Sequence, residues 1–269
     1  MYKEEVIDLY SMIRKRNPLI HQITNAVTVN DCANVTLAVG ASPVMASSIE
    51  EVEEMVKLAD ALVINIGTLQ SGVFKAMILA GKAANKIGIP IIFDPVGVGA
   101  TTFRKEKAKE FLRQVDVAVI RGNASEVDSL MGGASTTRGV DAGVVEISLK
   151  ELAVKTAVSY SCVVVISGQI DTISNGTETI QITNGDFWLK SITGTGCMST
   201  SLIGCFIGIT KDYFLAAIAG TSLMGLAGEK AKKRLQEDEG IGTYKVKLMD
   251  EIFIMNGDTW KEEVQIHES

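Results

Sequence analysis

The sequence predicts an α/β protein with a mostly parallel central sheet, helices on both faces and an antiparallel meander at one edge. Short continuous apolar runs recur between residues 61 and 166, as expected of strands buried on both faces. Helical stretches separate these runs, and strand–helix repeats of this kind form parallel sheets. Two Asn-Gly pairs between β-branched runs follow, and such pairs join antiparallel strands.

The alternating elements occupy the middle of the chain. The first strand ends at Gly67, and the helix after it closes near Gly88. The strands are predicted at 61–66, 89–94, 117–120 and 162–166. The helices are predicted at 72–87, 105–114, 124–131 and 148–160.

The pattern changes after the last of these strands. Residues 171–190 contain Asn175-Gly176 and Asn184-Gly185, and each pair is a type I′ hairpin signal, so the meander is predicted here. The most apolar stretch, 198–228, is interrupted by Lys211-Asp212, which leaves each half too short to cross a bilayer. We therefore expect two buried core helices and no membrane association.

Composition limits the classes of function. The 269 residues are 46% hydrophobic and 22% charged, which fits one globular domain over 1–269. The net charge of −6, with no basic block, argues against a nucleic-acid partner. No apolar segment follows the acidic start at Met1–Glu5, so we expect no secretory signal and a cytoplasmic protein. The 4 cysteines lack C-x-x-C spacing, which predicts free thiols and no zinc site.

Gly194-Thr195-Gly196-Cys197 precedes the first apolar helix of the C-terminal half. Two glycines at a helix N-terminus leave backbone N–H groups open to an anion, and the helix dipole adds positive charge there. This arrangement suits the charge that develops on a transferring phosphoryl group. The alternative is a tight turn that requires glycine, with Cys197 as a small buried hydrophobe.

Asp94-Pro95-Val96-Gly97-Val98-Gly99 ends a predicted parallel strand, where open α/β sheets bind ligands. A nicotinamide-binding loop is disfavoured because Thr102 replaces the third glycine and no acidic residue ends the next strand. Asp94 is then either a residue that caps the loop or a carboxylate that serves Mg²⁺ and phosphates.

Arg121-Gly122-Asn123-Ala124-Ser125-Glu126 also ends a strand. Asn123 followed by Glu126 matches a capping box, which is the structural interpretation. The functional interpretation places Glu126 near Mg²⁺ and Arg121 beside phosphate, and one helix can satisfy both. Gly81-Lys82 lacks the flanking residues of a P-loop, so that phosphate-binding motif is absent.

Two N-terminal segments are uncharged. His21 to Asn25, with Asn30, is polar, and Ala41 to Ala46 is mostly apolar. A capped helix start and an apolar loop explain them without function. As a pocket wall, they would let Met45 pack on a flat heteroaromatic ring, because thioether–aromatic contacts are favourable.

In their order along nearly the whole chain, these segments resemble the hydroxyethylthiazole kinase family of the ribokinase-like superfamily. The first three of the segments below are typical of the thiazole branch, whereas the last four occur in looser form across the superfamily. The matching segments are His21-Gln22-Ile23-Thr24-Asn25, Ser42-Pro43-Val44-Met45, Asn65-Ile66-Gly67-Thr68, Asp94-Pro95-Val96-Gly97-Val98-Gly99-Ala100, Arg121-Gly122-Asn123-Ala124-Ser125-Glu126, Gly194-Thr195-Gly196-Cys197 and Gly240-Ile241-Gly242-Thr243-Tyr244.

The resemblance implies a ribokinase-like fold and phosphorylation of the primary alcohol of 4-methyl-5-(2-hydroxyethyl)thiazole by ATP with Mg²⁺, in thiamine salvage. It also implies a homotrimer with substrate sites at subunit boundaries. The implied thiazole contacts are Asn25, Met45, Gly67 and Gly194; the implied ATP contacts are Arg121, Ser167 and Asp94; and the implied metal residues are Asp94 and Glu126.

Catalysis is assigned by the same resemblance to the Gly194 and Gly196 amides and to Cys197. The chain departs from the usual pattern at two of these positions. Ser167 stands where threonine is more usual, and the hydroxyl is kept. Cys197 stands where the superfamily usually has the aspartate that takes the alcohol proton. A helix N-terminus lowers a thiol pKa, so we expect Cys197 to be a modest base or a group that orients the hydroxyl.

Three other functions fit parts of the sequence. A sibling kinase for hydroxymethylpyrimidine, pyridoxal or a sugar would share the ATP site and differ in the N-terminal pocket. A nucleotide-dependent NAD(P)H-hydrate dehydratase would share the fold with a different reaction. A thiazole- or thiamine-binding protein would keep the fold without turnover.

Overall fold

The computed structural model describes residues 2–133 and 147–268. In this part of the chain one 9-stranded sheet has the order β2-β1-β3-β4-β5-β6-β7-β8-β9. Pairing is parallel from β2 to β6 and antiparallel from β6 to β9. The strands are β1 (Leu19–Ile23), β2 (Ser42–Val44), β3 (Ala61–Asn65), β4 (Ile91–Asp94), β5 (Val119–Asn123), β6 (Val163–Ser167), β7 (Asp171–Ser174), β8 (Thr179–Ile182) and β9 (Ile266–Glu268).

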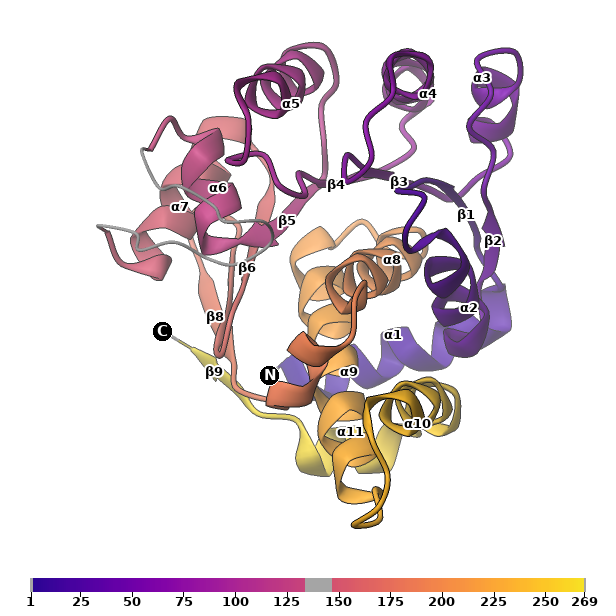
Figure 1. The fold of residues 1–269 in the computed structure, drawn as a ribbon, viewed down its shortest axis with the longest axis vertical. Coiled ribbons are helices and arrows are strands. Elements are labelled where there is room, and N and C mark those ends of the chain that lie inside the picture. Colours follow the sequence, from indigo (N-terminus) through magenta and orange to yellow (C-terminus); the bar gives the residue numbers. More distant parts are fainter. Residues whose placement is uncertain (1, 134–146, 269) are drawn as a thin grey trace.

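Helices cover both faces of the sheet (Figure 1). One face carries α3 (Val52–Val56), α4 (Ser71–Ile87), α5 (Thr102–Gln114), α6 (Ala124–Leu130) and α7 (Leu149–Tyr160). The other face carries α1 (Tyr2–Arg16), α2 (Val29–Val39), α8 (Thr195–Ile207), α9 (Tyr213–Lys233), α10 (Ile241–Ile254) and α11 (Gly257–Glu263). The predicted fold class, a mostly parallel sheet with flanking helices and antiparallel edge strands, is confirmed.

The central strands are apolar throughout because each contributes to two cores. On β3, Val63 belongs to the core beneath α8 and α9, while Leu62 and Ile64 belong to the core beneath α4 and α5. On β4, Ile92 belongs to the core beneath α8 and α9, and Phe93 belongs to the core beneath α4 and α5. Covering a parallel sheet on both faces removes the apolar–polar alternation, which is why continuous runs identified these strands.

The two N-terminal strands were not predicted. The segment from His21 lies in β1, and Ser42–Val44 forms the edge strand β2. His21 and Gln22 are fully buried, and partners from elsewhere in the chain make that burial tolerable. The Gln22 amide donates to the Thr36 hydroxyl at 2.8 Å and accepts from the Ser201 hydroxyl at 2.8 Å.

One of the two predicted hairpins is wrong. Asn175-Gly176 lies in the β7–β8 connection, where Gly176 has φ +95°, although the loop spans 175–178 and is not a two-residue turn. Asn184-Gly185 forms no hairpin, because β8 pairs next with β9 from the far end of the chain. The chain instead enters a 3₁₀ helix, η1 (Phe187–Ser191).

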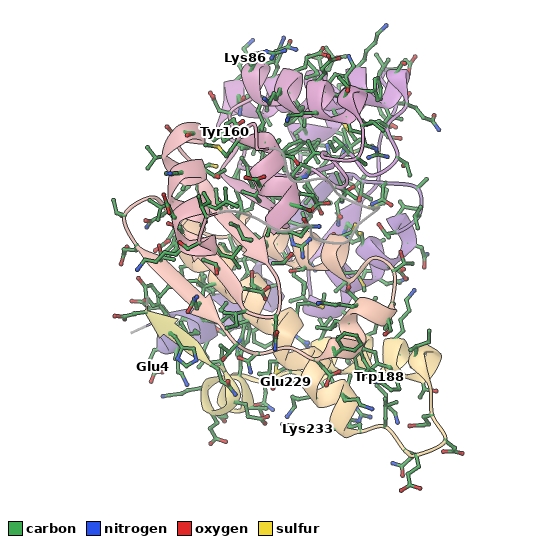
Figure 2. All side chains as sticks on the ribbon, turned by 60° about the vertical axis from the view of Figure 1, so that its left-hand side comes forward. Glu4, Lys86, Tyr160, Trp188, Glu229 and Lys233 are labelled. Atoms are coloured by element: carbon green, nitrogen blue, oxygen red, sulfur yellow. The ribbon has the colours of Figure 1, made fainter. Side chains whose placement is uncertain are left out.

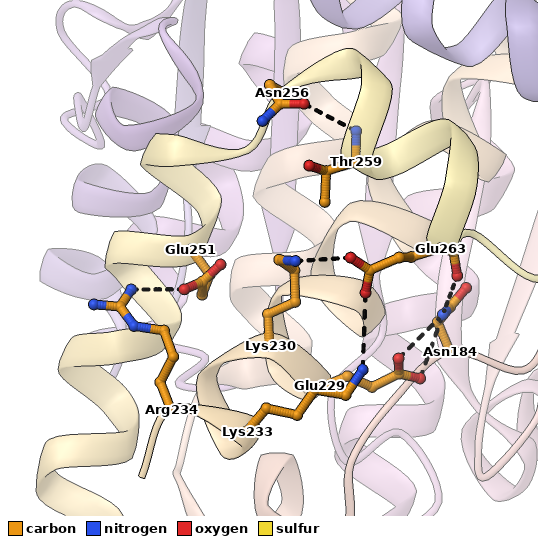
Figure 3. A network of polar contacts seen from close by, with 9 residues as sticks. All are labelled: Asn184, Glu229, Lys230, Lys233, Arg234, Glu251, Asn256, Thr259 and Glu263. Atoms are coloured by element: carbon orange, nitrogen blue, oxygen red, sulfur yellow. Dashed lines mark hydrogen bonds and ion pairs between the residues drawn. The ribbon is translucent and has the colours of Figure 1, made fainter.

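Tertiary hydrogen bonds hold the buried Asn184 side chain and override the local turn signal (Figure 3). Its amide nitrogen donates to Glu229 at 3.3 Å and to the Glu263 carbonyl at 3.1 Å. Its amide oxygen accepts from the Gln265 backbone N–H at 2.6 Å. Asn184 therefore joins α9 to the segment that leads into β9.

The predicted core helices within 198–228 are α8 and most of α9, and both are largely buried. They approach closely at Gly220, where a Cβ atom would lie 2.6 Å from Cγ1 of Ile203. Among the described residues no helix is both long and apolar enough to span a membrane.

The segment that leads into α8 is anchored by Trp188 of η1, which is labelled in Figure 2. Its ring meets Tyr244 edge-on at 5.6 Å, and the Lys232 ammonium lies 3.8 Å from its centroid. Both are favourable aromatic contacts. They fix η1 against α9 and α10 and so position the start of α8.

Candidate active site

The candidate site lies at the edge of the sheet where the parallel strands end. Asp94 is the last residue of β4, Ser167 the last residue of β6, and Arg121 is on β5. Asn25 and Gly67 lie just beyond β1 and β3. Because parallel strands end at a common edge, residues far apart in the sequence come together here.

The first turn of α8 faces this edge. Gly194 is its N-cap, with φ +89°, and accepts from the Met198 N–H at 2.8 Å. A Cβ atom at Gly194 would lie 2.6 Å from Cγ2 of Thr28, and one at Gly196 would lie 2.7 Å from Nη1 of Arg121. Both glycines therefore allow close approach, and the first-turn N–H groups have no partner within the helix. The arrangement can hold an anion beside Arg121.

Asp94 is completely buried. Its Oδ2 atom accepts from the Thr200 hydroxyl at 2.7 Å and from the Asn65 amide at 2.9 Å. Its Oδ1 atom has no hydrogen-bond partner in the described part of the chain. Burial raises the pKa of Asp94, and the charge of Arg121 opposes the rise. One carboxylate oxygen is thus left without a hydrogen bond in this part of the chain.

Glu126 forms the capping box that the sequence allowed. Its two carboxylate oxygens accept from the Gly97 N–H at 2.7 Å and from the Asn123 N–H at 2.8 Å. Burial raises its pKa to about 7, and the charge of Asp94 adds to the rise despite those two hydrogen bonds. The structural interpretation therefore holds, and it leaves Glu126 as a buried carboxylate near Asp94.

Arg121 supplies positive charge to this group of acids. Its charge lowers the pKa values of Asp94, Glu126 and Asp171 against the effect of burial. Its buried Nε atom has no partner among the described residues. A cation with an unused donor beside the first turn of α8 is suited to bind phosphate.

The remaining predicted site residues lie at the same edge. Ser167 is half-buried, and its hydroxyl donates to the Gly122 carbonyl at 3.4 Å. Met45 follows β2 directly and is half-buried. The next residue is held by His21, whose Nε2 atom lies 2.8 Å from the Ala46 carbonyl oxygen. The carbonyl can only accept, so this ring nitrogen carries the proton.

The Cys197 thiol is buried among amides. Its Sγ atom lies 3.2 Å from the Asn25 Nδ2 atom and 3.3 Å from the Asn65 Nδ2 atom. Burial raises its pKa to about 12, and the negative charge of Asp94 contributes. The pKa is therefore raised, whereas the helix N-terminus was expected to lower it. The thiol is protonated at neutral pH, which favours orientation of a hydroxyl over proton abstraction.

Three residues that contact the site were missed as site residues. Asn65 and Thr200 hold Asp94, and Arg104 donates to carbonyls of Ile66, Val96 and Gly67 at 2.7–2.9 Å, which ties the loops after β3 and β4 together. Asn65 could have been recognised from the sequence as a site residue, because it is a polar residue at the end of an apolar strand.

Asp94 and Glu126 are the two buried carboxylates that the sequence analysis associated with a cation. No group of three or more His, Cys, Asp or Glu residues surrounds a common point in residues 2–133 and 147–268. Mg²⁺ needs fewer protein ligands than three, because it keeps several waters and is bound through one or two carboxylates and substrate phosphates. The unpartnered Asp94 Oδ1 atom fits that mode of binding.

A buried acid, an arginine and an open helix N-terminus at one end of a parallel sheet can supply the positioning and charge stabilisation on which phosphoryl transfer depends. They place this chain among the α/β small-molecule kinases. The family model described as the hydroxyethylthiazole kinase family matches residues 10–257, and the chain belongs to this family.

Individual relatives agree with that assignment. The hydroxyethylthiazole kinase of Alkaliphilus oremlandii (strain OhILAs) is 48% identical over 269 residues, which covers 99% of this chain and 98% of that protein. The structure of the hydroxyethylthiazole kinase protein from Pyrococcus horikoshii OT3 has a TM-score of 0.90 and 38% identity, with 99% of each chain covered. A ribokinase-like superfamily protein from Enterococcus faecalis V583 shares the fold at a TM-score of 0.62 and 14% identity, with 87% of this chain and 86% of that chain covered. The family resemblance seen in the sequence is confirmed.

The raised pKa of Glu126 predicts a pH dependence of stability. A carboxyl whose pKa rises from 4.5 to about 7 on folding stabilises the fold at pH values below 4.5, and this contribution is lost as the pH rises through about 7. The loss is about 3 kcal/mol for the wild type without Mg²⁺. Glu126→Gln cannot ionise, so denaturant unfolding at pH 5 and pH 8 should show a smaller difference in free energy of unfolding.

The matched control is Glu151→Gln. Glu151 follows the N-cap Ser148 of α7 as Glu126 follows Asn123, but it is exposed. This variant should keep the wild-type pH dependence. If the Glu126→Gln variant also keeps the wild-type difference between pH 5 and pH 8, the pKa of Glu126 is not raised by burial.

Proposed function

We propose that this protein transfers the γ-phosphoryl group of ATP to the primary alcohol of 4-methyl-5-(2-hydroxyethyl)thiazole, a step of thiamine salvage. The observation that carries the proposal is the similarity to hydroxyethylthiazole kinases over almost the whole chain. The proposed thiazole contacts named below carry no charge, which supports it, because a sugar or a phosphate ester calls for charged partners. We also propose that residues 1–269 act as a single kinase domain.

Asn25, Met45, Gly67 and Gly194 are proposed to bind the thiazole. Asn25 is buried, and its amide lies 3.2 Å from the Cys197 sulfur. Gly67 packs so close to Asn25 that a Cβ atom would lie 2.9 Å from the Asn25 Cβ atom. A bound alcohol next to these residues would therefore lie beside the first turn of α8.

Arg121, Ser167 and Asp94 are proposed to bind ATP. The first-turn N–H groups from Gly194 to Cys197 would bind the oxygens of the moving phosphoryl group. Asp94 and Glu126 would hold Mg²⁺, which supplies charge neutralisation to the phosphates when bound. The protein contributes position and electrostatics rather than covalent chemistry. All 4 cysteines are free and buried, which fits a reducing cytoplasm, where we place the protein.

The substrate proposal predicts a ranking of alcohols. With ATP and Mg²⁺ present, ADP release should be stimulated by the thiazole alcohol more than by hydroxymethylpyrimidine, pyridoxal or ribose, because the pocket residues are uncharged. Chelation of Mg²⁺ should abolish this stimulation. Equal stimulation by pyridoxal or ribose would reject the thiazole assignment. If no alcohol stimulates ADP release, the alternative of a binding protein without turnover is favoured.

Cys197 is proposed to orient the alcohol while protonated. Cys197→Ala should lower kcat by about 10- to 100-fold, at or below the lower end of what proton-transfer groups contribute, because an orienting group moves no proton. Cys197→Asp should keep substantial activity. Because the pKa of the thiol is raised to about 12, wild-type kcat should show no rise near pH 8.5 from this group.

The matched control is Cys205→Ala, which removes a fully buried thiol from the same helix. This change should lower stability and leave kcat at the wild-type value. If Cys197→Ala behaves in the same way across the pH range, the Cys197 side chain only fills space.

We further propose that the protein is a homotrimer with thiazole sites at the subunit boundaries. Apolar side chains are exposed around the N-terminal pocket segments, including Val27 at 64% and Leu37 at 55%. Val27 is also adjacent to the pocket, because its N–H donates to the Asn25 side chain at 3.1 Å. A neighbouring subunit would cover this surface and complete the pocket.

Light scattering should show a particle of three times the 28.8 kDa chain mass. Val27→Glu places a charge in the proposed boundary and should lower that mass and raise KM for the alcohol by at least about tenfold, or about 1.4 kcal/mol. Val158→Glu changes an equally exposed valine, 64%, on α7 and should change neither. A wild-type monomer at micromolar concentration would contradict the shared site.

A further inference from the structure

Asn65 lies where the two proposed substrate sites meet. It ends β3 and is buried. Its Nδ2 atom donates to Asp94 Oδ2 at 2.9 Å, and its Oδ1 atom accepts from the Gly67 N–H at 2.9 Å and from Asn25 Nδ2 at 3.0 Å. One short side chain thus contacts the phosphate end and the alcohol end of the site.

The orientation of this amide is fixed by its neighbours. The Gly67 N–H can only donate, so the Asn65 oxygen faces Gly67 and the Asn65 nitrogen faces Asp94. Asn25 is fixed in the same way, because its oxygen accepts from the N–H groups of Val27 and Thr28, both at 3.1 Å. The hydrogen bonds therefore run in one direction, from the backbone through Asn25 and Asn65 to Asp94.

All side-chain N–H groups of the two asparagines have acceptors. Asn25 donates to Asn65 and to the Cys197 sulfur, and Asn65 donates to Asp94 and to the same sulfur. Thr200 also donates to the Asp94 oxygen that Asn65 contacts. Two donors thus hold Asp94 Oδ2, while Oδ1 has no partner within the described residues. The two oxygens of the carboxylate are thus distinguished, and Oδ1 is the one left to a ligand under the proposed function.

We propose that Asn65 is a positioning residue that holds the free oxygen of Asp94 in register with the alcohol pocket. The proposal rests on the proposed function, because that function assigns Asp94 to ATP and the metal and Asn25 to the alcohol. The reacting groups must meet within a few tenths of an ångström, and a misplacement of about 1 Å can lower the rate by about 10²-fold. A shared side chain is a direct way to keep both sites aligned.

Substitutions can distinguish the contribution of the Asn65 amide oxygen from that of its nitrogen. Asn65→Asp keeps oxygens that accept from Asn25 and Gly67, removes the N–H groups that hold Asp94 and Cys197, and places a negative charge beside Asp94. Asn65→Leu removes both ends at similar volume. A matched control is Asn184→Asp, because Asn184 is also a buried amide whose nitrogen donates to a carboxylate, that of Glu229, and whose oxygen accepts from a backbone N–H, that of Gln265.

The experiment measures kcat and KM for both substrates, calorimetric binding of the thiazole alcohol without nucleotide, and thermal unfolding. Asn65→Asp should bind the alcohol within about threefold of wild type while kcat falls about 100-fold. Asn65→Leu should lower kcat and also weaken alcohol binding by at least about tenfold. Asn184→Asp should change only the unfolding temperature.

A structural role for Asn65 would give a different result. If Asn65→Asp is folded and keeps wild-type kcat, or weakens alcohol binding as much as it lowers kcat, the positioning role is overturned. Failure of the wild type to turn over the thiazole alcohol would contradict the proposed function instead. The same comparison of kcat with binding is then made with whichever tested alcohol the wild type phosphorylates.

Discussion

Parallel pairing of β1, β3, β4, β5 and β6 is the constraint on which the site depends. Strands that run in one direction end at one edge, and their last residues become neighbours whatever the length of the connections. Asn65 is the register partner of Asp94, and Asn123 is the partner of Ser167. Neighbouring strands lie about 4.8 Å apart, so short side chains suffice to bridge them. The hydrogen bond from the Asn65 amide on β3 to Asp94 on β4 follows from this geometry.

The position of α8 is the second condition for the site. A Cβ atom at Gly204 would lie 2.6 Å from Cγ2 of Val63, so the helix lies unusually close to the sheet. Thr200 and Ser201, on successive positions of α8, bond Asp94 on β4 and Gln22 on β1. Close packing and two polar contacts therefore fix the helix, and with it the first turn that faces the site.

The middle of the sheet and the strand-end motifs could be predicted because their signals are local. Continuous apolar runs identified β3 to β6, and polar motifs at strand ends brought Asp94, Arg121 and Glu126 to one edge. β1 could not be predicted in this way, since burial of Gln22 depends on partners from α2 and α8. Asn184 carried a strong local turn signal that contacts with distant residues overrode.

The same limit explains which parts of the site were missed. Asn65 and Thr200 acquire their roles from a contact with Asp94, which no sequence spacing reveals. The pKa of Cys197 is a related case. A helix N-terminus lowers a thiol pKa, but the sequence does not show that the sulfur is buried near the negative charge of Asp94, which raises it.

The electrostatics of the site are compatible with a neutral group at position 197. Asp94 and Glu126 are both buried, and burial raises both pKa values even with Arg121 nearby. A third carboxylate at this position would add negative charge to a group that already resists ionisation. A thiol adds none, and its sulfur accepts hydrogen bonds from both asparagine amides. Since a loose phosphoryl-transfer transition state demands little covalent assistance, a neutral residue that orients the alcohol is compatible with catalysis by position and charge.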